Sequence, residues 1–228
     1  MASSPRKANP VSPELKALIK KAKDPKTSFK QLGKLQKHPE VEVRRALLDN
    51  PNLCPTNEDG KINTSLLETL AREFPEEVTA HPAFVLHALV EPDDEMLGVV
   101  IKVVRRTADV GLIETLLRTW GPDSLYVRKG VAVNPSTPLD VLRLLGNEVT
   151  ESMWFVRAAV AENPNTPVDT LRILGNEATE SSWLVRQAVA QNPSTPPDVL
   201  RLLGNKKTES VGYVRAAAAE ALAARGLT

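Results

Sequence analysis

Arginines recur at one position of a repeated motif, and guanidinium groups of this kind can bind carboxylates or phosphates. The dipeptide Val-Arg returns every 29 residues in the second half of the chain and occurs once near the N-terminus. Its arginines are Arg128, Arg157, Arg186 and Arg215, with Arg44 upstream. A ladder of these side chains would be a candidate site for a protein partner. We favour pairing inside the protein, because a buried charge needs a partner. The candidate acids are Asp140, Asp169 and Asp198.

Two columns of large side chains precede these arginines. The first column holds Leu125, Trp154, Trp183 and Gly212, and the second holds Tyr126, Phe155, Leu184 and Tyr213. Adjacent helical residues point about 100° apart, so both columns cannot easily face the core. We expect the Tyr/Phe column to pack in the core. The Trp column stays open between core and exposed margin, where Trp154 and Trp183 would be candidate anchors for a protein partner.

Lysines near the N-terminus form two rows at helical spacing. They are Lys16, Lys20 and Lys23 in one row, and Lys30, Lys34 and Lys37 in the other. Ser12 and Pro13 are predicted to begin the first helix. Its inner face would hold Leu15, Leu18, Ile19 and Ala22. A solvated helix face is the commoner reason for such rows, and a patch that follows a phosphate backbone is the alternative. Only Phe29 is nearby to stack on a base, so sequence-specific RNA recognition is not expected.

Groups suited to catalysis or metal binding are sparse. His38, His81 and His87 have no recognised metal-ligand spacing, and the single cysteine, Cys54, excludes an internal disulfide. No glycine-rich phosphate loop, nucleophile elbow or His-Glu-x-x-His motif occurs. We therefore expect no catalytic residue, no cofactor and no metal. An enzyme hidden in residues 84–120 is the least favoured hypothesis.

The elements that position these residues repeat in the C-terminal half. The stretch 127–147 returns at 156–176 and at 185–205, and begins again at Val214. Within each copy, a threonine before a proline and an acid three residues later predict a capped helix start. These threonines are Thr137, Thr166 and Thr195. The first helix would bury Leu142, Leu144 and Leu145 and end at a left-handed glycine, Gly146, with Gly175 and Gly204 in the later copies.

A second helix completes each repeat. The connector Thr-Glu-Ser supplies new cap residues, and the following helix should end at the Asn-Pro pairs that begin at Asn134, Asn163 and Asn192. A pair of such short helices cannot bury its apolar face alone, so neighbouring repeats must stack. The pattern predicts an all-α solenoid of two-helix repeats. In the last copy the Asn-Pro pair is lost, which is typical of a terminal cap.

A degraded copy of the same pattern occurs upstream, where Asp24-Pro-Lys-Thr27 matches Asn134-Pro-Ser-Thr137. Residues 1–45 hold 12 Lys/Arg and 4 Asp/Glu, a net +8, and the rest hold 17 and 24, a net −7. We expect a flexible N-terminus (1–12) and a basic helical repeat unit (13–55). Degenerate repeats (56–120) follow, and then three regular repeats with a C-terminal capping helix (121–228).

The signature Val-Arg-x-Ala-Val-Ala-x-Asn-Pro-x-Thr-Pro resembles the leucine-rich repeat variant family, and the Val-Arg that opens the second helix is similar to HEAT repeats. The match is strong over 127–222 and weaker over roughly 24–82. The resemblance implies a right-handed superhelix that holds protein partners and sometimes nucleic acid, without catalysis. The family's prototype binds an iron–sulfur centre through a cysteine cluster, which one cysteine cannot form. The longer period here leaves open a 3₁₀ turn as first element, but we favour an α-helix.

These observations predict a non-enzymatic scaffold or adaptor that binds a protein partner. Nucleic-acid binding through the lysine-rich N-terminal unit and the solenoid groove is the alternative. Low cysteine usage, together with the absence of a signal peptide or an apolar stretch long enough for a membrane span, indicates a cytoplasmic protein. We expect no membrane association and no small-molecule substrate.

Overall fold

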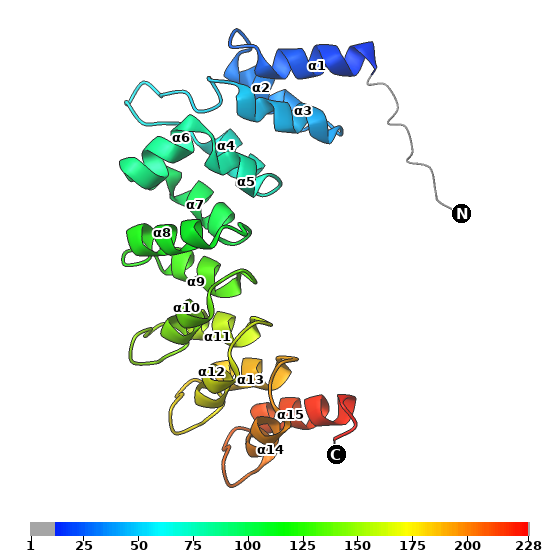
Figure 1. Ribbon diagram of the computed structural model, residues 1–228, viewed down its shortest axis with the longest axis vertical. Coiled ribbons are helices and arrows are strands. Elements are labelled where there is room, and N and C mark those ends of the chain that lie inside the picture. Colours follow the sequence, from blue (N-terminus) through cyan, green and yellow to red (C-terminus); the bar gives the residue numbers. More distant parts are fainter. Residues whose placement is uncertain (1–11, 228) are drawn as a thin grey trace, which may run out of the picture. The chain divides into compact units, whose positions relative to one another are not determined.

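The computed structural model describes residues 12–227, and its regular secondary structure is helical (Figure 1). The predicted flexible N-terminus lies outside the described residues except for Ser12. Within the described range there is no β-strand, only an isolated bridge between Thr56 and Ile62. No helix in this range is long and apolar enough to cross a bilayer. The all-α prediction is confirmed. The chain divides into two compact units, Met1–Val99 and Val100–Thr228.

The N-terminal unit is a series of short helices. They are α1 (Pro13–Lys23), α2 (Phe29–Leu35), α3 (Val41–Ala46), η1 (Leu47–Asp49), α4 (Ser65–Leu70), α5 (Pro75–Thr79), α6 (Pro82–Phe84), η2 (Val85–Val90, a π turn), η3 (Asp94–Met96) and the start of α7 (Leu97–Val104). Ser12 caps α1 as predicted, since its Oγ accepts from the backbone N–H of Leu15 at 3.1 Å. On the inner face of α1, Ala22 is fully buried and Leu15, Leu18 and Ile19 are half-buried.

The C-terminal unit contains the regular repeats. Its helices are the end of α7, α8 (Val110–Trp120), α9 (Leu125–Val133), α10 (Leu139–Leu145), α11 (Trp154–Glu162), α12 (Val168–Leu174), α13 (Trp183–Gln191), α14 (Pro197–Gly204) and α15 (Gly212–Ala224). Helices α9, α11, α13 and α15 pack side by side in chain order, with α10, α12 and α14 between them in sequence (Figure 1). The predicted solenoid of two-helix repeats is confirmed, and the first element of each repeat is an α-helix. The right hand of the superhelix stays a prediction.

One valine in each repeat marks the core. Val127, Val156, Val185 and Val214 are fully buried at equivalent positions of the second helices. On the first helix of the repeat, the predicted apolar stripe is wrong at one residue. Leu144 is 51% exposed, and Val141 is buried beside Leu142 and Leu145. Residues four apart lie on the same side of a helix, which places Val141 above Leu145 and turns Leu144 outward.

The predicted capping role of Thr137, Thr166 and Thr195 is wrong. Each hydroxyl donates instead to the carbonyl six residues earlier, Thr137 to Val131 at 2.6 Å, and the later two threonines do the same. The first helices begin two residues after these threonines, as at Leu139, with a proline in the cap position. The threonine therefore satisfies a carbonyl left open at the end of the preceding helix.

The glycines that end the first helices are not left-handed, contrary to the prediction. Gly146 has φ −91° and Gly175 has φ −89°. A Cβ on Gly146 would lie 2.6 Å from Cγ2 of Thr170 and 2.9 Å from the Leu142 carbonyl oxygen. A methyl group cannot approach other atoms so closely. The glycine is needed for close packing against the next repeat.

Asparagines tie each repeat to the one before it. The buried Asn163 donates from Nδ2 to the carbonyls of Ala132 (2.8 Å) and Asn134 (2.9 Å). Asn50, Asn134 and Asn192 make equivalent pairs of hydrogen bonds. The Asn-Pro signature therefore ends a helix and also binds the preceding repeat, a role that the sequence pattern did not predict.

His81 occupies the same place as these asparagines in the N-terminal unit. Its Nδ1 accepts from the backbone N–H of Ala83 at 3.2 Å, as Oδ1 of Asn163 accepts from Asn165 at 2.9 Å. Burial lowers the pKa of His81 below its ordinary 6.5, while a hydrogen bond with the backbone of Asn50 opposes the shift. Burial therefore favours the neutral imidazole over the charged one.

Candidate protein-binding surface

An exposed row of aromatic side chains lies at the start of the second helices. Tyr126 is 62% exposed, Trp154 44%, Trp183 39% and Tyr213 74%, while Phe155 is half-buried. We call Tyr126, Trp154, Phe155, Trp183 and Tyr213 the aromatic ridge. The buried valine that follows each pair explains this arrangement. With the valine turned to the core, the one or two residues before it rotate toward solvent.

The rings of the ridge contact one another within and between repeats. Trp183 on α13 and Tyr213 on α15 have ring centroids 6.1 Å apart. Trp154 and Phe155 meet edge to face at 5.8 Å. The ammonium of Lys129 on α9 lies 6.0 Å from the centre of the Phe155 ring on α11. The ridge thus contains two pairs of rings in contact and one lysine over a ring.

The ridge takes most of the aromatic side chains that the chain has. The whole sequence contains three Trp, two Tyr and four Phe, and five of these nine residues form the ridge. The buried aromatic side chains elsewhere are Trp120, Phe74 and Phe84, each no more than 7% exposed. Pairs of exposed aromatic side chains on one surface are uncommon in proteins that bind nothing, because their burial is favourable.

The structure shows that neither of the two columns of large side chains forms the core. Trp154 and Trp183 are exposed, as the interface hypothesis requires. The prediction that the Tyr/Phe column packs in the core is wrong, since Tyr126 and Tyr213 are the most exposed rings of the ridge. Neither column is needed for the core, because the valine one residue later fills that position.

The arginine column lies largely inside the protein. Arg157 and Arg186 are 2% exposed, and each guanidinium grips one glutamate through two nitrogens. In Arg157, Nε donates to Glu180 Oε2 at 2.6 Å and Nη2 to Oε1 at 2.8 Å. Arg186 does the same with Glu209. The glutamates raise the pKa of both arginines, chiefly through these hydrogen bonds. An exposed ladder is thus not formed at these two positions.

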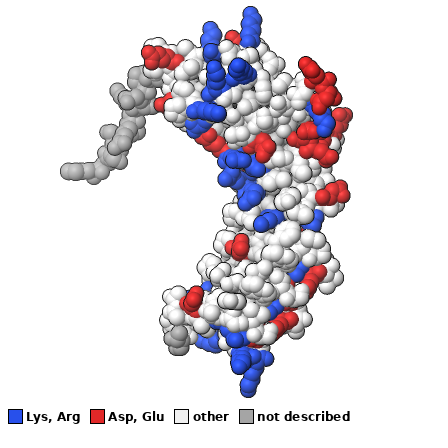
Figure 2. All heavy atoms as spheres, turned by 180° about the vertical axis from the view of Figure 1, so that it is seen from behind, with Lys and Arg blue, Asp and Glu red and all other residues white. Residues whose placement is uncertain are grey.

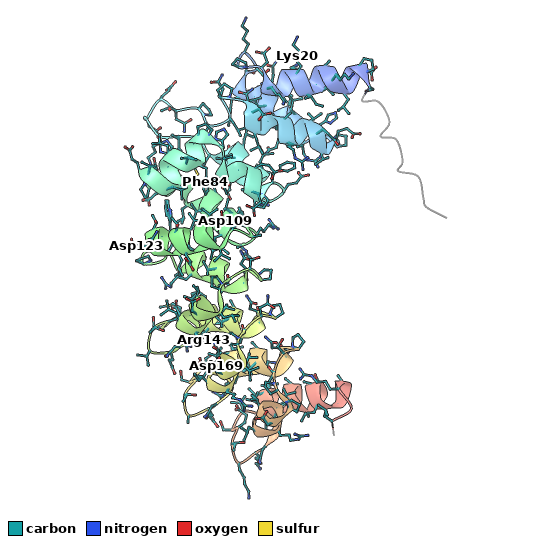
Figure 3. The ribbon with its side chains drawn as sticks, viewed as in Figure 1. Lys20, Phe84, Asp109, Asp123, Arg143 and Asp169 are labelled. Carbon is teal, nitrogen blue, oxygen red and sulfur yellow. The ribbon has the colours of Figure 1, made fainter. Side chains whose placement is uncertain are left out.

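The acids that pair with the arginines are not the predicted ones. The partners belong to the Thr-Glu-Ser connectors and are Glu151, Glu180 and Glu209, buried to 3% exposure or less. Asp169 and Asp198 pair instead with Arg143 and Arg172 on the exposed first helices. Nε of Arg143 on α10 lies 3.0 Å from Oδ2 of Asp169 on α12 (Figure 3).

The connector glutamate also takes the capping role that the sequence assigned to the Thr-Glu-Ser connector as a whole. The carboxylate of Glu180 accepts from the backbone N–H of Ser182, two residues later.

The two ends of the arginine series differ from its centre. Arg128 is half-buried, and its Nε donates to Glu151 at 2.6 Å. Arg215 is also half-buried, and its Nη1 donates to the carbonyls of Glu209 (2.9 Å) and Ser210 (2.7 Å). Arg44 in the N-terminal unit grips Glu73 bidentately. The same mode of pairing therefore occurs in both units.

The predicted lysine rows are exposed on α1 and around α2. Lys16, Lys20, Lys23, Lys30, Lys34 and Lys37 all face solvent. Lys23 pairs with Asp49 at 2.7 Å, and the other five have no ion pair among the described residues. Figure 2 shows basic side chains gathered over this part of the N-terminal unit, and Figure 3 labels Lys20 on α1. The rows are accessible, but the one aromatic residue among them in sequence, Phe29, is half-buried.

The N-terminal unit also has a cleft of about 840 Å³ beside Cys54 and His81. Among its charged lining residues, Lys23 pairs with Asp49 and Arg45 pairs with Glu77. Burial raises the pKa of the Cys54 thiol to about 12, so the thiol stays protonated at neutral pH. Among residues 12–227, no group of three or more His, Cys, Asp or Glu side chains is arranged to hold a metal ion.

Comparison with known families identifies two of the repeats. The family model described as leucine rich repeat variant matches residues 154–176 and 183–205. These segments contain α11 with α12 and α13 with α14, including Trp154 and Trp183. No curated protein and no solved structure matches the chain. Residues 154–176 and 183–205 are therefore leucine rich repeat variant repeats, as the signature in the sequence predicted.

Proposed function

We propose that this chain is a non-enzymatic helical-repeat scaffold that binds a protein partner through the aromatic ridge. One observation carries the proposal: each of the four repeats exposes an aromatic ring at one of two adjacent positions at the start of its second helix, although the core does not use these rings. Tryptophan and tyrosine are the side chains that contribute most to protein interfaces. The paired arginines fix the second helices, and so the spacing of the rings. The presence of a single cysteine, Cys54, agrees with a reducing compartment such as the cytosol.

The test of this proposal is the double variant Trp154→Ala with Trp183→Ala. A tagged chain and the variant are used to capture partners from a nuclease-treated native lysate. A stoichiometric partner should bind the variant at least about tenfold more weakly, because buried interface tryptophans each contribute about 2 kcal/mol or more. The matched control is Leu144→Ala with Leu202→Ala, which removes exposed apolar side chains from α10 and α14. Equal binding by the tryptophan variant would overturn the proposal.

The exposed lysine rows favour a second candidate function, non-specific binding of nucleic acid. Lysine ammonium groups release counterions from a phosphate backbone, so binding through them weakens steeply with salt. The variant Lys16→Glu, Lys20→Glu, Lys30→Glu should then lose binding to duplex DNA or single-stranded RNA in a gel-shift titration. Lys206→Glu with Lys207→Glu, on the exposed connector after α14, is the control of the same chemistry. Retained affinity in the first variant would remove this candidate.

A further inference from the structure

Arg215 on α15 has a guanidinium whose carboxylate partner is missing among the described residues. The equivalent arginines on α11 and α13 each hold the glutamate of the following connector through Nε and Nη2. In Arg215 only Nη1 has acceptors among the described residues, and these are the carbonyls of Glu209 and Ser210. We call the Nε and Nη2 donors of such an arginine its fork. In Arg215 both donors of the fork are therefore open.

The open fork is held in the same position as the filled ones. Nη1 of Arg186 donates to the carbonyl of Glu180 at 2.8 Å, and Nη1 of Arg215 donates to that of Glu209 at 2.9 Å. Both acceptors lie six residues before their arginine. Because this bond orients the planar guanidinium in advance, a carboxylate that reaches Arg215 need not order it.

The fork of Arg215 is also less covered than its equivalents. Arg186 is 2% exposed, whereas Arg215 is half-buried. The position of Trp154 and Trp183 is occupied in this repeat by Gly212, and a Cβ there would lie 3.6 Å from Nη2 of Arg215. A tryptophan at this position would stand beside the guanidinium. Glycine has no side chain that could cover Nη2.

The carbonyl groups at the other side of this helix pair are satisfied, so the lack of a partner is confined to the fork. In the asparagine series, the next member would donate to the carbonyl of Asn192. Arg225 fills that place, donating from Nη2 to Asn192 at 2.9 Å and from Nη1 to Thr195 at 2.6 Å. The asparagine series is thus satisfied within the chain, and the arginine series is not.

We propose that the open fork of Arg215 binds a glutamate or aspartate side chain of the protein partner, with apolar neighbours of that acid resting on Trp183 and Tyr213. This inference rests on the proposed function and names the chemistry of the partner. Carboxylate is the expected ligand because the same fork, in the same backbone frame, holds a glutamate at Arg157 and Arg186. Arg44 and Glu73 repeat the geometry in the N-terminal unit. The two ridge rings lie at the start of α13 and α15, and Tyr213 is two residues from the fork.

The probe for the test is the chain's own segment that fills such a fork. It is an acetylated peptide of residues 176–184, Asn-Glu-Ala-Thr-Glu-Ser-Ser-Trp-Leu, in which Glu180 is the acid that meets Arg157. The peptide is titrated into the ¹⁵N-labelled full chain, and the Nε–H resonance of Arg215 and the indole N–H of Trp183 are followed by NMR. The Arg215 signal is assigned by its loss in Arg215→Lys.

The expected result is a saturable shift of the Arg215 signal. A peptide with Glu180→Gln should bind about tenfold more weakly, because a charge-assisted bidentate bond is lost. Arg215→Lys should lose about as much, and Arg201→Lys, an exposed arginine on α14, should lose nothing. The peptide comparison uses the unaltered chain, so it does not depend on how any variant folds.

Three outcomes would overturn the inference. The first is equal binding of the Glu and Gln peptides, and the second is a Trp183 shift without an Arg215 shift. The third is that neither signal shifts at the highest peptide concentration that stays in solution. The second outcome would leave ridge binding intact while removing the fork. The proposed function is judged separately by the tryptophan double variant, so the two failures are distinguishable.

Discussion

At the residue scale, the buried Arg–Glu pairs differ from the exposed Arg–Asp pairs of the same repeats in burial rather than in chemistry. Arg157 and Glu180 are 2% and 0% exposed, whereas Arg172 and Asp198 are 48% and 55% exposed. Removing one member of a buried pair leaves an uncompensated charge, while water replaces the partner in an exposed pair. The two kinds of pair therefore make a matched comparison.

We predict that Arg157→Met lowers the free energy of unfolding by about 3–5 kcal/mol. Arg172→Met should lower it by at most about 1 kcal/mol. Urea denaturation of both variants measures the difference. In the double variant Arg157→Met with Glu180→Met, much of the loss should return, because no buried charge is left unpaired. Equal losses in the two single variants would show that burial of the pair has no energetic weight.

His81 gives the N-terminal unit a dependence on pH. Burial lowers its pKa in the folded state below the 6.5 of the unfolded chain. Its stabilising contribution is therefore complete above pH 6.5 and is lost as the pH falls through the lower folded pKa. Protonation of Nδ1 would also remove the acceptor for the Ala83 N–H.

The prediction is that His81→Asn flattens the decline of unfolding free energy between neutral and mildly acidic pH. Asparagine is the residue of the equivalent positions, and its Oδ1 accepts at every pH in this range. Urea denaturation of both chains across this window provides the comparison. An unchanged decline in the variant would assign the pH dependence to other groups.

At the element scale, the first helix of each repeat ends where the next repeat approaches most closely. Gly146 and Gly204 are equivalent in sequence but not in surroundings. A Cβ on Gly146 would meet Thr170 at 2.6 Å, whereas a Cβ on Gly204 would find only Ala218, at 4.0 Å. The closest contact at Gly146 comes from the repeat that follows α10, since α12 places Thr170 against the glycine.

We predict opposite effects of alanine at these two glycines. Gly146→Ala should destabilise the chain by about 1–3 kcal/mol, because its methyl group forces the neighbouring helix to move. Gly204→Ala should be neutral or stabilising by up to about 1 kcal/mol, since alanine restricts the unfolded chain. Thermal unfolding of the two variants checks this. If Gly204→Ala lost as much stability as Gly146→Ala, the contact with Thr170 would not be the reason that Gly146 is needed.

The elements themselves could be predicted from the sequence, but the partners between elements could not. The Asn-Pro pairs and the Val-Arg motif predicted where the second helices begin and end, because proline restricts the residue before it. Two acidic columns, however, follow each arginine, and chain spacing does not say which one meets it. The structure pairs Arg157 with an acid 23 residues on and Arg143 with one 26 residues on. That choice depends on the offset between stacked helices.

The candidate site was predictable only in part for a similar reason. The tryptophan column was recognised as a possible anchor, but helical periodicity alone allows several rotations of a short helix. The valine at 0% exposure fixes the rotation of α11, and the rings then point outward. The open fork of Arg215 became apparent only once Glu209 and Glu180 were known to be the partners of the other arginines.

At the scale of the whole molecule, the C-terminal unit is held together by interactions that repeat with the chain. Arg157 donates to the carboxylate of Glu180 in the next repeat, as Arg186 does to that of Glu209. Asn192 donates to the carbonyls of Ala161 and Asn163 in the preceding repeat, and Asn163 makes the equivalent bonds one repeat earlier. Each bond joins a repeat to its immediate neighbour. Stability should then be close to a sum of repeats and nearest-neighbour interfaces.

Deleting residues 156–184 should therefore leave a shorter folded chain. Phe155 would join Val185, Arg186 would take the place of Arg157, and its Nη1 would meet the carbonyl of Glu151. Asn192 would likewise reach Ala132 and Asn134. Far-UV circular dichroism should show the same helical character and one cooperative thermal transition, at a lower temperature because one interface is lost. Deletion of residues 168–184 removes α12 and the first two residues of α13 while leaving α11, and it should abolish the cooperative transition. If both deletions unfolded alike, bonds between nearest neighbours would not account for the stability of this unit.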